Sequence, residues 1–166
     1  MMETSHIIKA VVMDVDGVLT DGHIYLSAEG PGLKRLSFRD VMGVSLGRKA
    51  GLRFALISGE GGPLLERIAS QFGIEEVFPD CKDKAQALQT FASRNGLALS
   101  ELCFMGDDVN DLPAMAIVGH SACPADAHPS VLGEALWVMK AKGGQGAVRE
   151  LLDLLSAKPK VRGEAL

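Results

Sequence analysis

The stretch Val11-Val12-Met13-Asp14-Val15-Asp16-Gly17-Val18-Leu19-Thr20 decides the fold of this chain. Its apolar first half predicts a buried β-strand, and the carboxylates, glycine and hydroxyl that follow mark the end of that strand. Side chains alternate along a strand, so Asp14 and Asp16 are expected on one face and Val15 on the other, in the core. Two like charges this close favour a divalent cation beside them. The alternative interpretation is a solvated acidic turn, because Asp and Gly are common turn residues.

Two further apolar segments end in polar residues. The segment 53–58 ends in Ser58 before a glycine-rich loop, and the segment 102–105 is followed by Gly106-Asp107-Asp108. Strands that alternate with helices of about ten residues predict an α/β fold, with a central parallel sheet covered on both faces. Ligands bind such sheets at the carboxyl ends of the strands, near a switch in strand order. Polar groups at three strand ends therefore predict a site there, which a solvated turn does not.

The remaining pattern predicts one domain over residues 1–157 and a disordered tail over 158–166. Short β-prone runs around a Gly/Pro turn predict a hairpin at about 23–38. Asp40 is expected to cap the helix that follows, Pro63 to lie in the first turn of the next helix, and Asp83 to cap a third. The expected strands are 7–13, 53–58, 76–78, 102–105, 119–122 and 136–139; the expected helices are 40–50, 63–72, 83–95, 111–117 and 147–155, with a helical turn near Val131.

The composition is that of a globular protein with a real core. The chain has 166 residues, 47% of them apolar and 23% charged. A formal charge of −4 and a pI of about 5.5 argue against a general nucleic-acid binder, which would show a basic patch. No secretory signal and no apolar run of membrane-spanning length is present, so no membrane association is expected. Three cysteines without metal-type spacing fit a cytoplasmic protein with reduced thiols.

The acidic strand ends suggest a chemistry. Asp14 and Asp107 can bind Mg²⁺, which favours one or two carboxylates together with water and substrate phosphate. A carboxylate held there can attack phosphorus and form an aspartyl-phosphate. Asp16 is placed to protonate the leaving alkoxide and then to activate the hydrolytic water.

The transferred phosphoryl group also needs donors and positive charge around it. Ser58 can hydrogen-bond a phosphoryl oxygen, aided by backbone N–H groups of the loop and helix start that follow. Lys82 and Lys84, both near a predicted helix N-terminus, are the two candidates for the cation.

Four motifs in chain order resemble those of the haloacid dehalogenase superfamily of phosphatases: Asp14-Val15-Asp16-Gly17-Val18-Leu19-Thr20, Ser58-Gly59, Asp83-Lys84 and Gly106-Asp107-Asp108-x-x-Asp111. The resemblance implies a Rossmann-like three-layer fold with Asp14 as nucleophile and Asp16 as acid/base, its backbone carbonyl on the Mg²⁺. It favours Lys84 over Lys82. It further implies phosphoryl binding by Ser58 and Lys84, metal ligation by Asp107, and support of the metal site by Asp108 and Asp111.

Four more segments resemble the 3-deoxy-D-manno-octulosonate 8-phosphate phosphatase family: Thr20-Asp21-Gly22-His23-Ile24-Tyr25, Phe38-Arg39-Asp40, Pro124-Ala125-Asp126-Ala127 and Gly143-Gly144-x-Gly146-Ala147-Val148-Arg149-Glu150. This resemblance implies a sugar-acid phosphate as substrate. It also implies a capless homotetramer, with a hairpin in place of a cap domain and a neighbouring subunit completing the site. The spacing agrees independently, because the 43 residues between Asp14 and Ser58 and the 22 between Lys84 and Asp107 leave no room for a cap domain.

The sequence departs from the octulosonate pattern at three positions, Val41, Glu60 and Gln145, where glycine, arginine and arginine are usual. Glutamate after Ser58-Gly59 instead resembles the phosphatases of 2-keto-3-deoxynononate 9-phosphate, so that substrate is the alternative. The candidates for substrate binding are Gly59, Glu60, Arg39, Lys34 and Thr20. For Arg39 and Lys34, the equal alternative is a solvated surface charge.

Two other function classes compete. A non-catalytic oligomerisation module, like the phosphatase-like domains fused to some sugar-acid cytidylyltransferases, would not need Asp14, Asp16, Ser58, Lys84 and Asp107 together. A phospho-accepting receiver domain also uses acidic residues, a hydroxyl and a lysine, but its phosphorylated aspartate follows the third strand and not the first.

Overall fold

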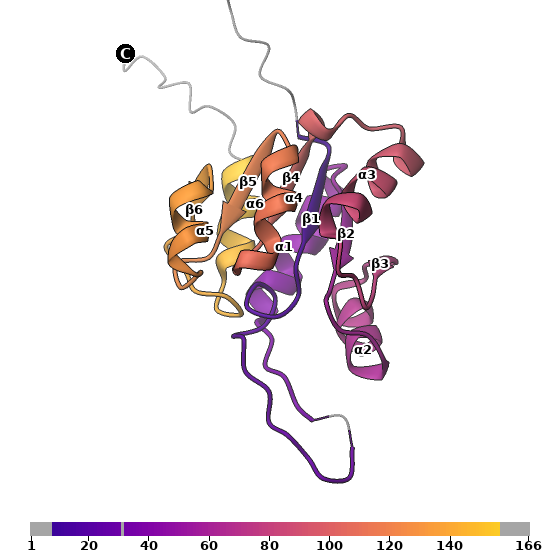
Figure 1. The fold of residues 1–166 in the computed structure, drawn as a ribbon, viewed down its shortest axis with the longest axis vertical. Helices are drawn as coiled ribbons and strands as arrows, with labels where there is room; N and C mark the ends of the chain where they lie inside the picture. The colour runs from indigo at the N-terminus through magenta and orange to yellow at the C-terminus, as the bar shows by residue number, and fades with distance from the viewer. Residues whose placement is uncertain (1–7, 31, 157–166) are drawn as a thin grey trace, which may run out of the picture.

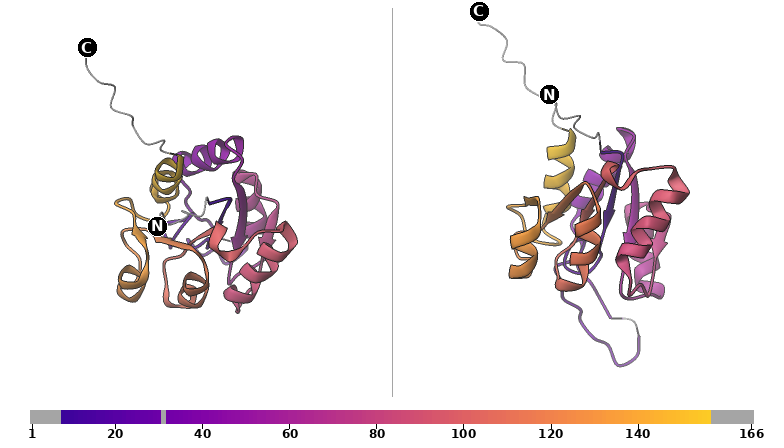
Figure 2. Two further views of the ribbon diagram at one scale, coloured as in Figure 1. Left: turned by 90° about the horizontal axis from the view of Figure 1, so that it is seen from above. Right: turned by 45° about the horizontal axis from the view of Figure 1, so that its top comes forward.

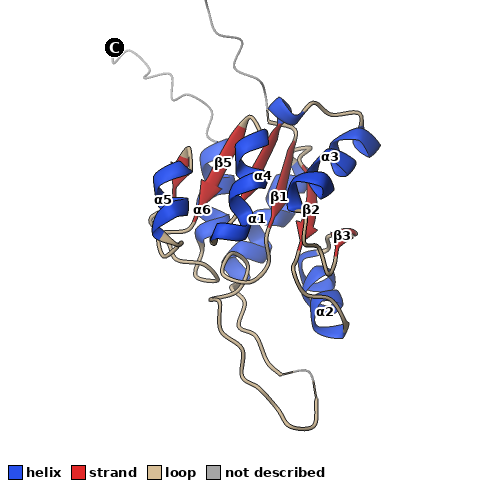
Figure 3. Cartoon of the chain, viewed as in Figure 1, coloured by secondary structure: helices blue, strands red, loops and turns tan. Residues whose placement is uncertain are grey.

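The computed structural model describes residues 8–30 and 32–156, which form six parallel strands with helices on both faces (Figures 1 and 3). The strands are β1 (Ala10–Met13), β2 (Arg53–Ile57), β3 (Glu76–Phe78), β4 (Leu102–Met105), β5 (His120–Cys123) and β6 (Trp137–Val138). The helices are α1 (Phe38–Lys49), α2 (Pro63–Phe72), α3 (Lys84–Asn95), α4 (Leu112–Ile117), α5 (Pro129–Glu134) and α6 (Ala147–Ser156), with 3₁₀ turns at Leu99–Glu101 and Val109–Asp111. The predicted α/β class and parallel sheet are confirmed.

The order of the strands places the site. It is β3-β2-β1-β4-β5-β6, so the chain moves outward from β1 in one direction and then returns to β1's other side with β4. β1 pairs with both β2 and β4 in parallel register, with Met13 opposite Leu56 and Met105. The switch in strand order therefore falls between β1 and β4, and Asp14 and Asp107 follow these two strands.

Two apolar layers hold the helices to the sheet. α1, α2 and α6 pack on one face and α3, α4 and α5 on the other, as the view from above shows (Figure 2). β1 alternates between the layers, with Val11 and Met13 in the first and Val12 in the second. All four of its residues are fully buried, as expected of a central parallel strand. Val15 is 1% exposed and lies in the first layer, as predicted.

The predicted hairpin forms only in part. Residues 20–30 and 32–36, called the arm below, run out from the body and back again (Figure 1). Isolated antiparallel bridges join Thr20 to Leu36 and Tyr25 to Leu33, and the described residues of the arm contain no longer ladder. Most arm side chains between the bridges are exposed, so little packing supports continuous strands there.

The prediction that Asp40 caps α1 is wrong. α1 begins two residues earlier, and the side chain of Ser37 accepts the capping hydrogen bond from the Arg39 backbone N–H. Asp40 is fully buried, and its carboxylate accepts hydrogen bonds from the backbone N–H groups of Gly146 (3.3 Å) and Arg149 (2.8 Å). The carboxylate thus caps α6 from outside that helix, where the helix dipole favours negative charge.

The other caps agree with prediction. Pro63 opens α2, and Asp83 caps α3 by accepting a hydrogen bond from Gln86 N. The remaining bounds differ from prediction by three residues or fewer, and the expected 111–117 helix is divided between the second 3₁₀ turn and α4. The expected tail lies outside the described residues, and the single domain over 1–157 stays a prediction. Among the described helices, none has the length and hydropathy to cross a bilayer.

Candidate active site

A polar cleft of about 250 Å³ opens at the carboxyl ends of the central strands. Its lining includes most of the site residues predicted from the sequence, together with two others: Asp14, Asp16, Gly22, Gly59, Glu60, Lys84, Asp107, Asp108 and Asn110. Gly22 and Asn110 were not predicted, although Asn110 falls inside the Gly106–Asp111 motif. Lys82 is exposed and does not line the cleft, so of the two candidate lysines the structure brings Lys84 to the site.

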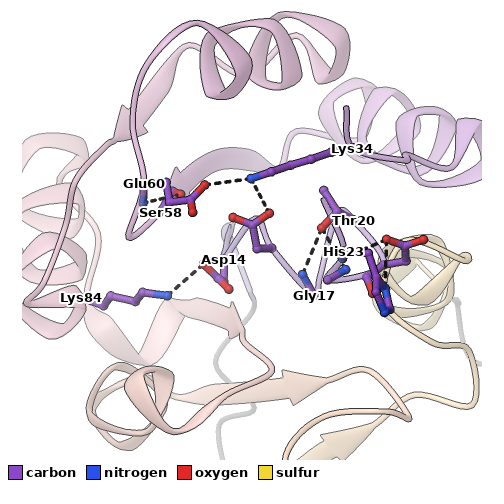
Figure 4. Close-up of polar contacts among 11 residues, drawn as sticks. Asp14, Gly17, Thr20, His23, Lys34, Ser58, Glu60 and Lys84 are labelled. Carbon is purple, nitrogen blue, oxygen red and sulfur yellow. Dashed lines mark hydrogen bonds and ion pairs between the residues drawn. The ribbon is translucent and has the colours of Figure 1, made fainter. Parts of the chain in front are cut away.

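Lys84 is the inner cation of the cleft (Figure 4). As the first residue of α3 it points at the end of β1, and its ammonium lies 2.9 Å from the Asp14 carboxylate and 2.6 Å from that of Asp111. All three side chains are nearly or fully buried. Burial alone would lower the pKa of Lys84, but the two carboxylates raise it above its usual value, so the ammonium stays charged.

Asp111 supports both Lys84 and the loop after β4. Its second carboxylate oxygen accepts hydrogen bonds from the backbone N–H groups of Asp107 (2.9 Å) and Asp108 (3.2 Å). Asp108 is exposed, and its side chain caps the 3₁₀ turn through Val109 N at 2.7 Å. Both residues thus act on the shape of this loop.

The carboxylates of Asp14, Asp107 and Asp111 form a cluster suited to a cation. Oxygens of the three lie within 4.8 Å of one another. Burial and then the charge of Asp111 raise the pKa of Asp14 to about 6, although Lys84 opposes the shift. Burial and then Asp14 raise the pKa of Asp107 to about 8. One lysine therefore leaves this cluster short of positive charge, and a hard divalent cation with oxygen ligands fits it.

The loop after Asp16 depends on Gly17 and Thr20. Gly17 has φ +86°, and the carboxylate of Asp107 occupies the space that a Cβ would need. Thr20 is fully buried, and its hydroxyl accepts hydrogen bonds from Gly17 N and Gly22 N, each at 3.2 Å. The structure therefore places Thr20 beneath the loop and not on the cleft, where a substrate-binding residue was expected.

Ser58 and Gly59 follow β2 on the other side of the cleft. Ser58 is 2% exposed, and its backbone is held by hydrogen bonds with Phe78 O and Cys81 N. Its hydroxyl accepts a hydrogen bond from Glu60 N at 3.1 Å, which leaves its proton free to donate to a ligand.

Lys34 and Arg39 were predicted alike, but the structure separates them. Lys34 reaches from the arm to the cleft mouth, where its ammonium lies 2.7 Å from the Asp16 carboxylate and 3.0 Å from that of Glu60 (Figure 4). Its side chain is only 7% exposed, so a solvated surface charge is the wrong interpretation for Lys34. Arg39 is exposed in the first turn of α1 and does not line the cleft.

Comparison with known sequences gives one consistent result. The model of the haloacid dehalogenase-like hydrolase family matches residues 55–151. The 3-deoxy-D-manno-octulosonate 8-phosphate phosphatase of Yersinia pestis is 38% identical over 157 residues, which cover 94% of this chain and 84% of that protein. The phosphatase of the same name from Escherichia coli K12 is 36% identical over 148 residues, covering 89% and 79%.

Solved structures agree with the sequences. The cobalt-bound octulosonate 8-phosphate phosphatase of Haemophilus influenzae superposes with a TM-score of 0.87 at 35% identity, covering 90% of this chain and 88% of that one. The phosphatase of the same name from Moraxella catarrhalis, in complex with a magnesium ion, a phosphate ion and a KDO molecule, has a TM-score of 0.87 at 30% identity, covering 91% of this chain and 87% of that one.

Proposed function

This chain belongs to the haloacid dehalogenase-like hydrolases and, among them, to the octulosonate 8-phosphate phosphatase family of phosphoric monoester hydrolases, and we propose that it removes the terminal phosphate of 3-deoxy-D-manno-octulosonate 8-phosphate with Mg²⁺ as its cation. The observation that carries the proposal is the buried contact of Lys84 with Asp14 and Asp111 beside Asp107. It supplies one candidate nucleophile, one fixed cation and an acidic cluster at the switch point of the sheet.

Asp14 is the proposed nucleophile. Its carboxylate is held by Lys84 at the end of β1, which fixes the direction from which it attacks phosphorus in line with the leaving oxygen. Asp14, Asp107 and the backbone carbonyl of Asp16 would hold Mg²⁺, with Asp108 and Asp111 supporting that site. When bound, the ion would neutralise charge on the phosphoryl oxygens.

Ser58 and Lys84 are the proposed phosphoryl-binding pair. Ser58 follows β2 beside Gly59, which lines the cleft, and Lys84 is the first residue of α3, so the two can contact different oxygens of one phosphoryl group. The backbone N–H of Gly59, beside Ser58, is a further donor at this edge.

Asp16 is the proposed acid/base. It lines the cleft two residues beyond Asp14 and is more exposed, with 36% of its side chain accessible against 9% for Asp14. It gives a proton to the leaving sugar oxygen and then takes one from the water that hydrolyses the aspartyl-phosphate at Asp14.

The sugar acid is the finer part of the proposal. Glu60 and Lys34 stand at the cleft mouth, where the sugar would extend. The names of the relatives favour the eight-carbon acid, whereas the glutamate at position 60 favours the nine-carbon 2-keto-3-deoxynononate 9-phosphate as the alternative. Arg39 does not line the cleft of its own chain, so as a ligand of the substrate carboxylate it would have to reach the cleft of a neighbouring subunit.

A homotetramer is also proposed, with the arms meeting centrally and a neighbour completing the site. Its support is the arm's apolar side chains, with Tyr25 72%, Leu26 86% and Leu33 71% exposed in the single chain. Side chains of this kind on a protruding segment favour association. Sedimentation should give a tetramer, and replacing Leu26 and Leu33 with serine should give smaller species; an active wild-type monomer would overturn this part.

The experiment for the function is phosphate release with Mg²⁺ across a panel of sugar phosphates. The eight-carbon acid phosphate should give the highest kcat/KM, and Asp14→Asn should lose activity on every substrate. A preference for neutral hexose phosphates would overturn the substrate, and full activity of Asp14→Asn would overturn the nucleophile. An inactive wild-type protein that still assembles would favour the non-catalytic oligomerisation module.

A further inference from the structure

Two lysines form ion pairs with carboxylates of the cleft in matching arrangements. Lys84 is shared between Asp14, the proposed nucleophile, and Asp111. Lys34 is shared between Asp16, the proposed acid/base, and Glu60. In each arrangement one ammonium contacts one reacting carboxylate and one further carboxylate, so each reacting carboxylate has its own cation.

The burial of Lys34 is unusual for its position on the arm. Its neighbours are mostly accessible, with Leu33 71% exposed and the Arg35 side chain 63% exposed, but the Lys34 side chain is only 7% exposed. Ordering a lysine side chain costs rotamer entropy, so the contacts of Lys34 at the cleft must offset that cost. Burial alone would lower the pKa of Lys34, but hydrogen bonds with Asp16 and Glu60 raise it, so both contacts are charge-assisted.

We infer that Lys34 is a positioning residue, which holds the Asp16 carboxylate where it can exchange a proton with the leaving oxygen, and that Glu60 in turn holds Lys34. The inference rests on the proposed role of Asp16 but not on which sugar acid is the substrate. It gives the arm a part in the reaction of its own chain, separate from any part in assembly.

The geometry supports this order of roles. Asp16 is 36% exposed, and a side chain that accessible has alternative rotamers unless a bond selects one. The 2.7 Å contact with Lys34 is that bond. Glu60 is 68% exposed, and an ion pair at such a site contributes little stability by itself. Its effect is therefore expected through the place that it gives to Lys34.

The test compares three phosphate esters that differ in one property each. The octulosonate phosphate has an alkyl leaving group and a carboxylate, and glycerol 3-phosphate has an alkyl leaving group and no carboxylate. Cleavage of p-nitrophenyl phosphate releases p-nitrophenolate, a stable anion that needs no proton on leaving. Values of kcat/KM report the steps up to release of the alcohol or phenol, which include proton donation by Asp16. The variants are Lys34→Gln, Lys34→Arg, Glu60→Gln and the double Lys34→Gln/Glu60→Gln, with Arg35→Gln as the control for loss of a cation from the arm.

Loss of positioning should slow both alkyl esters and spare the aryl ester. For Lys34→Gln we expect kcat/KM to fall roughly 10- to 100-fold on the two alkyl esters, since a misplaced group costs up to about 10²-fold, and less than about 3-fold on p-nitrophenyl phosphate. Lys34→Arg should recover part of the loss and Arg35→Gln should match wild type. The double variant should be no slower than Lys34→Gln alone, because Glu60 acts through Lys34.

Three results would overturn the inference. A loss confined to the octulosonate phosphate would make Lys34 a sugar-binding residue. An equal loss on all three esters would make it an anchor of the arm or a phosphoryl ligand, and no loss would leave it without a role. If wild type instead prefers another sugar phosphate, the proposed substrate fails, but the comparison of alkyl with aryl esters still decides the role of Lys34.

Discussion

Asp111→Asn removes the charge on which two parts of the cleft depend. The fully buried carboxylate accepts from Lys84 at 2.6 Å and from the backbone N–H groups of Asp107 and Asp108 at 2.9 and 3.2 Å. Breaking a buried ion pair typically costs 3–5 kcal/mol, and the amide of asparagine can replace only some of these acceptor bonds. Relief of the repulsion that Asp111 exerts on Asp14 offsets part of the loss, so we expect a net destabilisation of about 3 kcal/mol.

This loss is large enough to measure without ambiguity. Urea unfolding at fixed protein concentration should show the lower free energy of unfolding, and Tm should fall by roughly 10 °C in a chain of this size. The kcat should fall as well, because Lys84 and the backbone of Asp107 both lose a fixed partner. Asp108→Asn is the matched control, since Asp108 is exposed and should change stability by less than about 1 kcal/mol. An Asp111→Asn protein within 1 kcal/mol of wild type would refute the role given to this carboxylate.

Three further predictions concern the helix cap, the acidic cluster and the glycine beside it. Asp40→Ala should lower the free energy of unfolding in urea by about 1–2 kcal/mol, because α6 loses its cap. Asp153→Ala, an exposed change on α6, is the control and should cost less than about 0.5 kcal/mol. The folded pKa values of Asp14 and Asp107, about 6 and 8, lie above their unfolded values, so the folded protein binds more protons than the unfolded chain. Without a cation, Tm should therefore fall as pH rises from 5 to 8. Calorimetry should show that Mg²⁺ binding releases protons and weakens below pH 8. Gly17→Ala should lower kcat more than tenfold, because its φ of +86° and the Asp107 carboxylate leave no place for a Cβ; unchanged steady-state kinetics would contradict that packing.

Local sequence patterns were sufficient for the sheet and for the inner part of the site. The apolar run before Asp14 can only be a buried strand, and its polar end must then meet the ends of its parallel neighbours. This is why Asp14, Ser58 and Asp107 could be placed at one edge before the structure was known. The position near a helix start left Lys82 and Lys84 as equal candidates, the family resemblance favoured Lys84, and the structure brings Lys84 to Asp14.

The contacts that escaped prediction join segments without a common periodicity. Asp40 has the sequence position of an N-cap for α1, but its carboxylate binds the start of α6, 106 and 109 residues away. Lys34 lies on an arm whose pattern predicts strand pairing, yet the described residues of the arm form two isolated bridges, and the Lys34 side chain contacts Asp16 at the cleft. In both cases tertiary contacts decide the outcome, because a buried charge needs polar partners: backbone N–H groups for Asp40 and carboxylates for Lys34.

The central claim, nucleophilic attack by Asp14, is tested most directly by locating the phosphoryl group on the protein during turnover. Enzyme in excess would be mixed with Mg²⁺ and sugar-acid phosphate carrying a labelled phosphorus, quenched in acid within one turnover, and digested for peptide analysis. The label should appear on the peptide that contains Asp14, should accumulate in Asp16→Ala because the second step is slowed, and should be absent from Asp14→Asn. A label on another residue, or phosphate release by Asp14→Asn at the wild-type rate, would contradict the assignment of Asp14.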